Sequence, residues 1–216
     1  MKTLANIGIA ISMLFFVSSC HHLEDIISPK KPEKKGPVFH TDETVIVTSF
    51  LANKDGDTPT DPDELLYENR KMNPIVAPDG HQLTFEEFSA VTGRMKLQCR
   101  EEGTKVTLRV KNLVPFGLYT AWVATLDESG EVVGLGATGG NDGSQSVFSA
   151  DSQGSATFSQ IVPEEMLSVR GKTTDCLLDE YEVHIVGAYH IDGRSYGPEL
   201  GPAGTVANQF AYFYQP

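Results

Sequence analysis

The sequence predicts an all-β fold, a single antiparallel β-sandwich of the Ig-like or jelly-roll-like kind with one or two short helices in its N-terminal part. Short runs of alternating apolar and polar residues are separated by glycine, proline, asparagine and aspartate. No pattern with a period of 3.6 residues runs long enough to compete with them. Strands at such short spacing, joined by glycine-rich turns, are typical of sandwiches and barrels.

The clearest element is a β-hairpin. Residues 94–100 alternate with Met95, Leu97 and Cys99 on one face, and residues 105–111 alternate with three apolar residues on the matching face. Glu101–Thr104 supplies the turn, so the two runs are expected to pair. Further strands are predicted at Leu118–Leu126, Glu131–Leu135, Gln145–Ser149, Ser155–Ile161, Glu180–His190 and Gln209–Tyr214.

The segment 38–93 is less regular. Its β-branched run Thr44–Thr48 predicts an edge strand, and the acidic stretch after it predicts a flap. Helices are predicted at Pro62–Arg70 and Thr84–Ala90. The second has Thr84 just ahead of two glutamates, which suits a helix start.

The N-terminus predicts a cleaved leader. Lys2 precedes the apolar run Ile7–Val17, and Val17-Ser18-Ser19-Cys20 follows. The apolar run is far shorter than the ~20 residues of a spanning helix. These residues resemble the lipobox of bacterial lipoproteins, which implies a signal peptide over 1–19 and a diacylglyceryl (palmitate-type) modification of Cys20. The alternative is an ordinary secretory signal in which Cys20 is incidental.

Residues 20–37 then predict a lipidated N-terminus and a proline- and lysine-rich tether, followed by a β-sandwich domain over 38–216. His21 stands where an aspartate would retain a lipoprotein in the inner membrane, so the resemblance implies the outer membrane. Which face of that membrane carries the domain is left open.

Charge and cysteine content narrow the function. Residues 37–216 hold 12 Lys+Arg against 26 Asp+Glu, a balance that disfavours nucleic-acid binding. Cys99 and Cys176 form an even pair in an oxidising compartment, which predicts a disulfide; two separately buried thiols are the alternative. No Cys-x-x-Cys motif supports a redox role.

The acidic loop Asn53–Glu64 is the candidate metal site. Counted as an EF-hand-type loop, it places oxygen ligands at Asn53, Asp55, Asp57, Asp61 and Glu64. Position 1 is usually aspartate, and Thr58 occupies the position that needs glycine. A solvated acidic turn is therefore the favoured interpretation, with calcium binding as the alternative and no other cofactor expected.

The sequence motifs do not support dinucleotide binding, a metal site built on histidines or catalysis. Gly134–Gly139 matches G-x-G-x-x-G, but no helix can open on the Gly140-Asn-Asp-Gly run that follows, so a dinucleotide site is not predicted. His184 and His190 stand roughly 20 Å apart on one strand and cannot share a metal. No G-x-S-x-G or H-E-x-x-H motif occurs. The chain is predicted not to be an enzyme; a hydrolase with carboxylates from distant positions is the weaker alternative.

The predicted function is binding. Trp122, with Tyr119 and Phe116, either forms an aromatic platform for a sugar or peptide or, as we expect, belongs to the core. Recognition is expected in three loops, Asn53–Glu64, Gly134–Ser144 (with Asn141 and Asp142) and Asp192–Gly204. The partner is expected to be the membrane through the anchor, together with an envelope protein or glycan.

Several stretches together resemble a group of secreted bacterial proteins of unknown activity, in which a G-x-Y-T-x-W strand follows a cysteine-bearing hairpin. They are Gly93–Cys99, Gly117–Trp122, Gly139–Ser144, Asp175–His184, Tyr196–Pro198 and Gln209–Ala211. The resemblance implies a single β-sandwich and supports the pairing of Cys99 with Cys176. It implies no catalytic residues.

Overall fold

The computed structural model describes residues 36–139, 142–163, 176–179 and 181–216. Residues Glu33–Pro216 form one compact unit. The predicted lipobox with Cys20, most of the predicted tether and Asn141 lie outside the described residues. Their assignment, and the boundaries at 19 and 37, therefore stay predictions.

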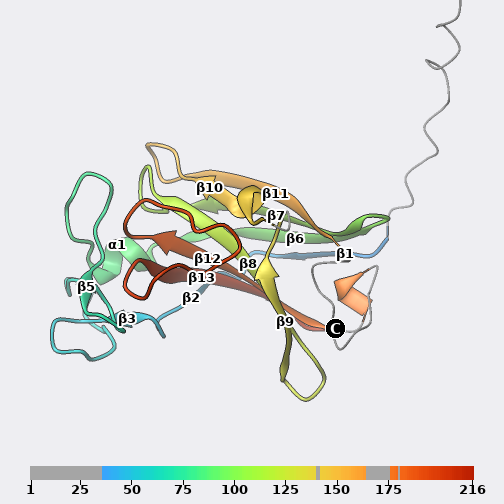
Figure 1. Cartoon of the computed structure of the whole chain (residues 1–216), viewed down its shortest axis with the longest axis horizontal. Helices are drawn as coiled ribbons and strands as arrows, with labels where there is room; N and C mark the ends of the chain where they lie inside the picture. The colour runs from blue at the N-terminus through green and yellow to red at the C-terminus, as the bar shows by residue number, and fades with distance from the viewer. Residues whose placement is uncertain (1–35, 140–141, 164–175, 180) are drawn as a thin grey trace, which may run out of the picture. The chain divides into compact units, whose positions relative to one another are not determined.

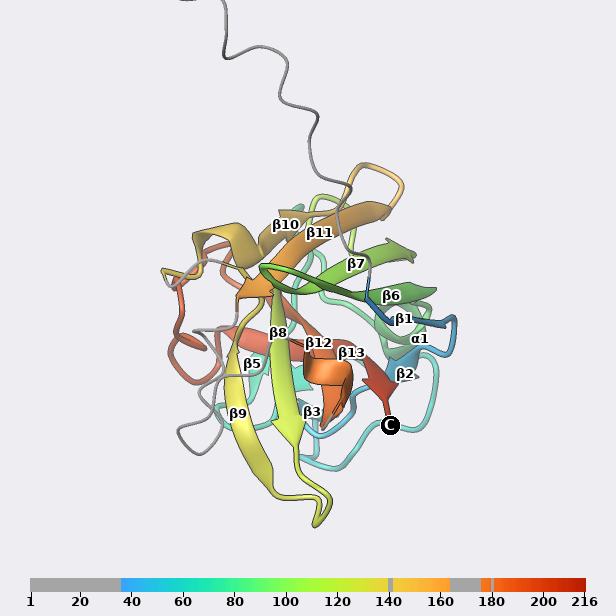
Figure 2. The ribbon, with the colours of Figure 1, turned by 90° about the vertical axis from the view of Figure 1, so that its right-hand side faces the viewer.

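The fold is an all-β sandwich of two antiparallel sheets, as the sequence predicts (Figures 1 and 2). Sheet A contains, in order, β1 (Val38–Thr41), β6 (Thr92–Arg100), β7 (Gly103–Lys111) and β11 (Ala156–Pro163). Sheet B contains, in order, β10 (Val147–Ser149), β8 (Leu118–Leu126), β12 (Glu182–His190), β13 (Val206–Tyr214) and β2 (Val45–Ile46). The strand β9 (Val132–Ala137) pairs with the second half of β8.

The core lies between these two sheets because apolar residues alternate along each strand. In the hairpin β6–β7, Met95 pairs with Leu108 and Leu97 with Val106, and all four side chains are buried. Val183 and Ile185 of β12 belong to the same core cluster. The predicted hairpin and its inward face are confirmed.

A small third sheet, sheet C, joins β3 (Leu51–Ala52), β4 (Tyr67–Glu68) and β5 (Asn73–Pro74). With the helix α1 (Phe85–Ser89) it lies at one end of the sandwich (Figure 1). Thr84 caps this helix by accepting from the Glu87 amide, while the Glu87 carboxylate accepts from the Thr84 amide. Phe88 is buried in the main core, so α1 closes that core rather than starting a second one.

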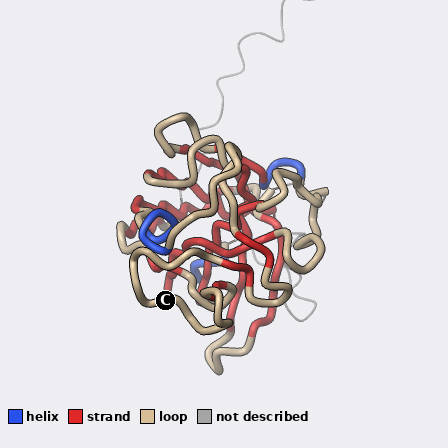
Figure 3. The backbone as a smooth tube through the Cα atoms, turned by 90° about the vertical axis from the view of Figure 1, so that its left-hand side faces the viewer, coloured by secondary structure: helices blue, strands red, loops and turns tan. Residues whose placement is uncertain are grey.

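The predicted helix Pro62–Arg70 is wrong, and helices are few in the described chain (Figure 3). Turns and β4 occupy this segment. Leu65 is 46% exposed whereas Leu66 is fully buried, which is the two-residue alternation of an extended chain. The strand β1, which the sequence did not reveal, pairs with β6 from Val38 opposite Gln98 to Thr41 opposite Met95.

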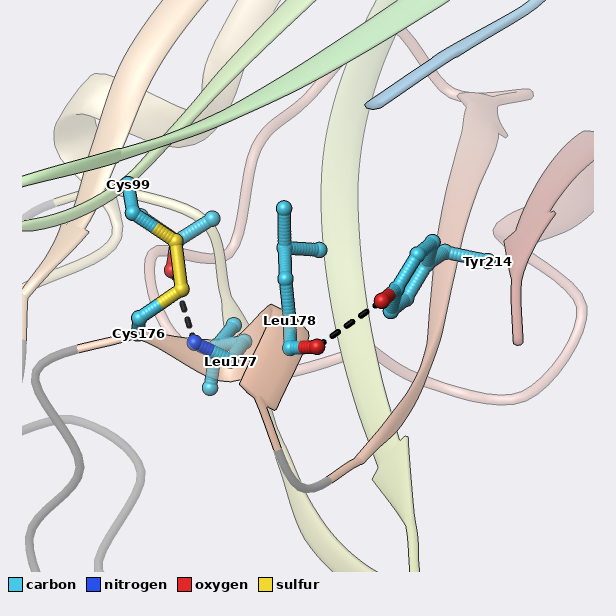
Figure 4. The surroundings of a disulfide bond; sticks show 6 residues. Cys99, Cys176, Leu177, Leu178 and Tyr214 are labelled. Carbon is cyan, nitrogen blue, oxygen red and sulfur yellow. Dashed lines mark hydrogen bonds between the residues drawn. A yellow bond between two sulfur atoms is a disulfide. The ribbon is translucent and has the colours of Figure 1, made fainter. Parts of the chain in front are cut away.

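A disulfide joins Cys99 of β6 to Cys176, with Cα atoms 5.3 Å apart, within the usual range for a bridge (Figure 4). The short helix η3 (Leu177–Asp179) follows Cys176 directly. The Leu177 amide donates to Thr104 Oγ1 at 3.0 Å, and the Tyr214 hydroxyl donates to the Leu178 carbonyl at 2.8 Å (Figure 4). The bridge therefore ties a segment next to sheet B onto the β6–β7 hairpin of sheet A.

Candidate functional site

The aromatic residues singled out in β8 lie on opposite faces of sheet B. Tyr119 is fully buried between the two sheets, whereas Trp122 is on the outer face. There Trp122 packs with Ala137, Ala188 and Val206 in a cluster separate from the main core, and only 7% of it is exposed. The expectation that Trp122 is a core residue is confirmed, because it is buried in a hydrophobic cluster, but this cluster lies on the outer face of sheet B. The positions differ by three, and residues an odd number apart on a strand face opposite ways.

A groove with a volume of about 570 Å³ lies over Trp122 on this outer face. Two of the three segments predicted to carry recognition contribute to it. Leu135 and Gly136, at the start of 134–144, belong to β9, and all other lining residues except Trp122 come from 192–204. The lining consists of Trp122, Leu135, Gly136, Tyr196, Pro198, Glu199, Leu200, Gly201 and Pro202. Leu135 is 61% exposed and Leu200 is 47% exposed, which is unusual for large aliphatic side chains.

Close backbone contacts hold the two loops against each other. A Cβ atom at Gly143 would lie 2.3 Å from the Gly197 carbonyl carbon, so only glycine fits at that approach. The Tyr196 ring covers Gly201 in the same way, and the Tyr196 hydroxyl donates to the Asp192 carboxylate. The wall of the groove is thus fixed by contacts within the fold.

A buried histidine lies beside the groove. Only 3% of His190 is exposed, its Nε2 is 2.6 Å from Thr120 Oγ1, and its ring centroid is 6.3 Å from that of Tyr196. Within the described chain its Nδ1 has no hydrogen-bond partner. Desolvation lowers the pKa of His190, partly opposed by the charge of Asp192. Burial therefore favours the neutral imidazole.

The charge of the groove restricts its ligands. Glu199 is the one ionisable acid in its lining, and the lining contains no lysine or arginine. Among the loop residues singled out from the sequence, Asp142 lies outside this lining and accepts from the amide and the hydroxyl of Ser144, which lower its pKa. The groove therefore suits an apolar or neutral ligand rather than an anion.

The third predicted loop, Asn53–Glu64, is not part of the groove and bonds to itself. Asn53 Oδ1 accepts from the amides of Asp55 and Asp57. Glu64 accepts from the Asn53 side-chain amide through Oε1 and from the amides of Thr60 and Asp61 through Oε2. These bonds, the one from Asn53 foremost, lower the pKa of Glu64. They already engage the oxygens of the first and last proposed calcium ligands. No group of three or more metal-binding side chains converges within the described ranges.

Two hollows elsewhere each contain a pair of carboxylates. Asp42 and Asp151 line one, and Glu43 and Glu182 line the other together with His184. Asp151 caps a turn by accepting from the amides of residues 153 and 155. His184, through its hydrogen bond, lowers the pKa of Glu182, whereas a general acid needs a raised one. Asp151 is therefore engaged in a turn, and Glu182 lacks the raised pKa that a general acid needs.

A second surface, on the outer face of sheet A, was not predicted from the sequence. Three cations of β6 and three of β7 lie on that face, which gathers half of the Lys and Arg residues of 37–216 on two strands. They are Arg94, Lys96, Arg100, Lys105, Arg109 and Lys111. The net charge of the whole domain is negative and gives no sign of this face. The signal in the sequence is the alternation of these cations with the apolar residues of the hairpin.

The structure places no membrane-spanning helix among the residues it describes. No known protein family matches the chain, and no curated protein or solved structure is significantly similar to it.

Proposed function

We propose that this chain is a lipid-anchored binding protein of the bacterial cell envelope without catalytic activity of its own. The lipobox-like Val17–Cys20 and His21 support anchoring through Cys20 in the outer membrane. The domain that follows provides a rigid sandwich with two loops fixed over one face. Loops on such a scaffold commonly carry recognition.

The groove over Trp122 is the observation that carries the binding function. We assign its occupant as an extended apolar peptide segment of another envelope protein. Leu135 and Leu200 flank the groove with their side chains largely exposed, and Trp122 with two prolines supplies further apolar surface. Within the described chain β9 pairs only with β8, so the strand that carries Leu135 lies at a sheet edge where an extended segment can lie alongside.

Selection from a library of displayed random peptides on residues 33–216 tests this assignment. We expect enriched peptides to carry apolar or aromatic residues. Burying two leucines on binding contributes enough that Leu135→Ser combined with Leu200→Ser should weaken the peptides about tenfold or more. The matched control is Leu65→Ser combined with Phe213→Ser, because both are exposed apolar residues outside the groove lining and outside β9.

Three results would contradict the assignment. One is no enrichment, the second is equal weakening by both pairs of substitutions, and the third is a neutral oligosaccharide that binds at the groove more tightly than any selected peptide. The anchor is tested separately by mass spectrometry of the mature protein from membranes. We expect a chain that begins at Cys20 and carries acyl groups; an unmodified N-terminus would remove the anchor from the proposal.

A further inference from the structure

We propose that the outer face of sheet A lies against the anionic headgroups of the membrane that carries the anchor. The choice of membrane rests on the proposed lipid anchor at Cys20, whereas the affinity for anionic headgroups rests on the fold alone. The face is defined by the six cations of β6 and β7 named above and is called the basic face.

The cations reach one surface because they alternate with core residues. Along β6 they flank the buried Met95 and Leu97, and along β7 they flank the buried Val106, Leu108 and Val110. The outward positions of these two strands contain no aspartate or glutamate. From Arg94 to Arg100 the row is about 20 Å long, at roughly 3.4 Å per residue.

Five of the six cations, all except Arg100, are not neutralised by other described residues. In the described part of the chain, no ion pair or side-chain hydrogen bond involves Arg94, Lys96, Lys105, Arg109 or Lys111. Arg94 lies directly opposite Arg109 in the β6–β7 register. Like charges opposite each other destabilise a sheet. An external anionic partner would remove that repulsion.

The extent of the basic face favours an extended anionic surface over a small anion or a nucleic acid. A single phosphate contacts two or three cations, whereas this row runs along both strands. The outward residues between the cations are threonine and glutamine, so no aromatic ring is available to stack on a base. The chain also enters the fold here, because the Gly36 amide donates to the Cys99 carbonyl and Pro37 leads into β1 beside β6.

The acidity of the whole domain does not oppose this contact at physiological salt. Charges are screened over about 8 Å there, so a bilayer senses the nearest face rather than the net charge. Among the described residues, acidic groups flank the basic face at its two ends. Asp42 and Asp151 line the hollow beside Arg94 and Arg109, and Glu101 and Glu102 are in the hairpin turn.

Co-sedimentation of residues 33–216 with vesicles tests the proposal without the lipid anchor. We expect binding to phosphatidylcholine vesicles that contain about 30 mol% phosphatidylglycerol, no binding to pure phosphatidylcholine, and weaker binding as salt rises. Each cation near an anionic bilayer contributes about fivefold to partitioning, so Arg94→Gln, Lys96→Gln and Arg109→Gln together should weaken binding on the order of 100-fold.

The matched control is Lys54→Gln, Lys71→Gln and Arg194→Gln, which removes the same charge from exposed cations outside the basic face. Equal weakening by both triple variants, or no binding to anionic vesicles, would overturn the proposal. So would tighter binding to a soluble polyanion such as heparin or DNA at equal anion concentration. Because the domain lacks residue 20, failure of lipidation leaves this result unchanged, and failure here leaves lipidation untouched.

Discussion

The Tyr119 hydroxyl donates to Gln209 Oε1 across the buried interior, at 2.8 Å. The same hydroxyl accepts from the Val114 amide at 2.9 Å, and Gln209 Nε2 donates to the Phe88 carbonyl at 2.7 Å. Tyr119 and Gln209 are both fully buried. This chain of bonds connects β8, β13 and α1, and burial raises the pKa of Tyr119 well above its usual range. The pair therefore attaches the helical end of the fold to sheet B.

Tyr119→Phe should lower the free energy of unfolding by about 1–3 kcal/mol, because it leaves a buried amide and a buried amide oxygen without partners. Chemical denaturation of residues 33–216 measures this. Tyr189→Phe is the matched control, since its hydroxyl donates only to the partly exposed Val76 carbonyl. An equal decrease in the free energy of unfolding of the two variants would show that the Tyr119–Gln209 bond contributes no more to stability than the Tyr189 bond.

Removing the disulfide by Cys99→Ala with Cys176→Ala should cost about 4 kcal/mol of unfolding free energy, since the bridge closes a loop of 77 residues. Denaturation of residues 33–216 with and without a reducing agent gives the same comparison in the wild type, because this domain has no other cysteine. If the reducing agent leaves the denaturation midpoint of the wild type unchanged, the bridge does not form.

The sequence predicts most of the sandwich because its long strands show the alternation of apolar and polar residues. The hairpin β6–β7 and the strand β8 were found by alternation alone, since one face of each meets the core. The small sheet C was missed because its strands are two residues long, too short to show a period. Local propensity around Pro62–Arg70 favours a helix. The observed chain is extended there, because burying Leu66 in the core while leaving Leu65 exposed stabilises the fold more than that helix would.

The sequence predicts the segments of the candidate site but not how they come together. The loops 134–144 and 192–204 were found from their turn residues, but nothing local shows that both cover Trp122. That juxtaposition depends on the order of strands in sheet B, where β8 lies between β9 and β12. The third loop looked equally promising and lies elsewhere, because it follows β3 of sheet C.

The buried His190 predicts a specific loss of stability in mild acid. Its folded pKa is lowered by desolvation, so the unfolded chain binds a proton more readily. The contribution of the neutral His190 to the free energy of unfolding is complete above the unfolded pKa of about 6.5. This contribution declines as the pH falls below that value. The unfolding free energy of the wild type relative to His190→Gln should therefore decrease between pH 7.5 and 5.5, measured by denaturant titration at each pH.

His81 serves as the control because its effect has the opposite sign. Asp79, through its hydrogen bond, raises the pKa of His81, so that stabilisation is present at low pH and lost as the pH rises through the folded pKa. His81→Gln should change the pH profile in the reverse direction. A wild type and a His190→Gln variant with parallel profiles would contradict a neutral, desolvated His190, and direct NMR titration of that ring would confirm the discrepancy.

We expect millimolar calcium to leave the thermal unfolding temperature of residues 33–216 unchanged. Calcium needs six to eight oxygen ligands, and the loop Asn53–Glu64 already directs both Glu64 oxygens and the Asn53 oxygen to its own amides. Coordination by Asn53 and Glu64 would compete with these bonds, and losing them would offset the gain from the metal. Glu64→Gln should therefore behave as the wild type does on adding calcium. A saturable rise in unfolding temperature that Glu64→Gln abolishes would restore the calcium site, and magnesium at the same concentration separates it from a general salt effect.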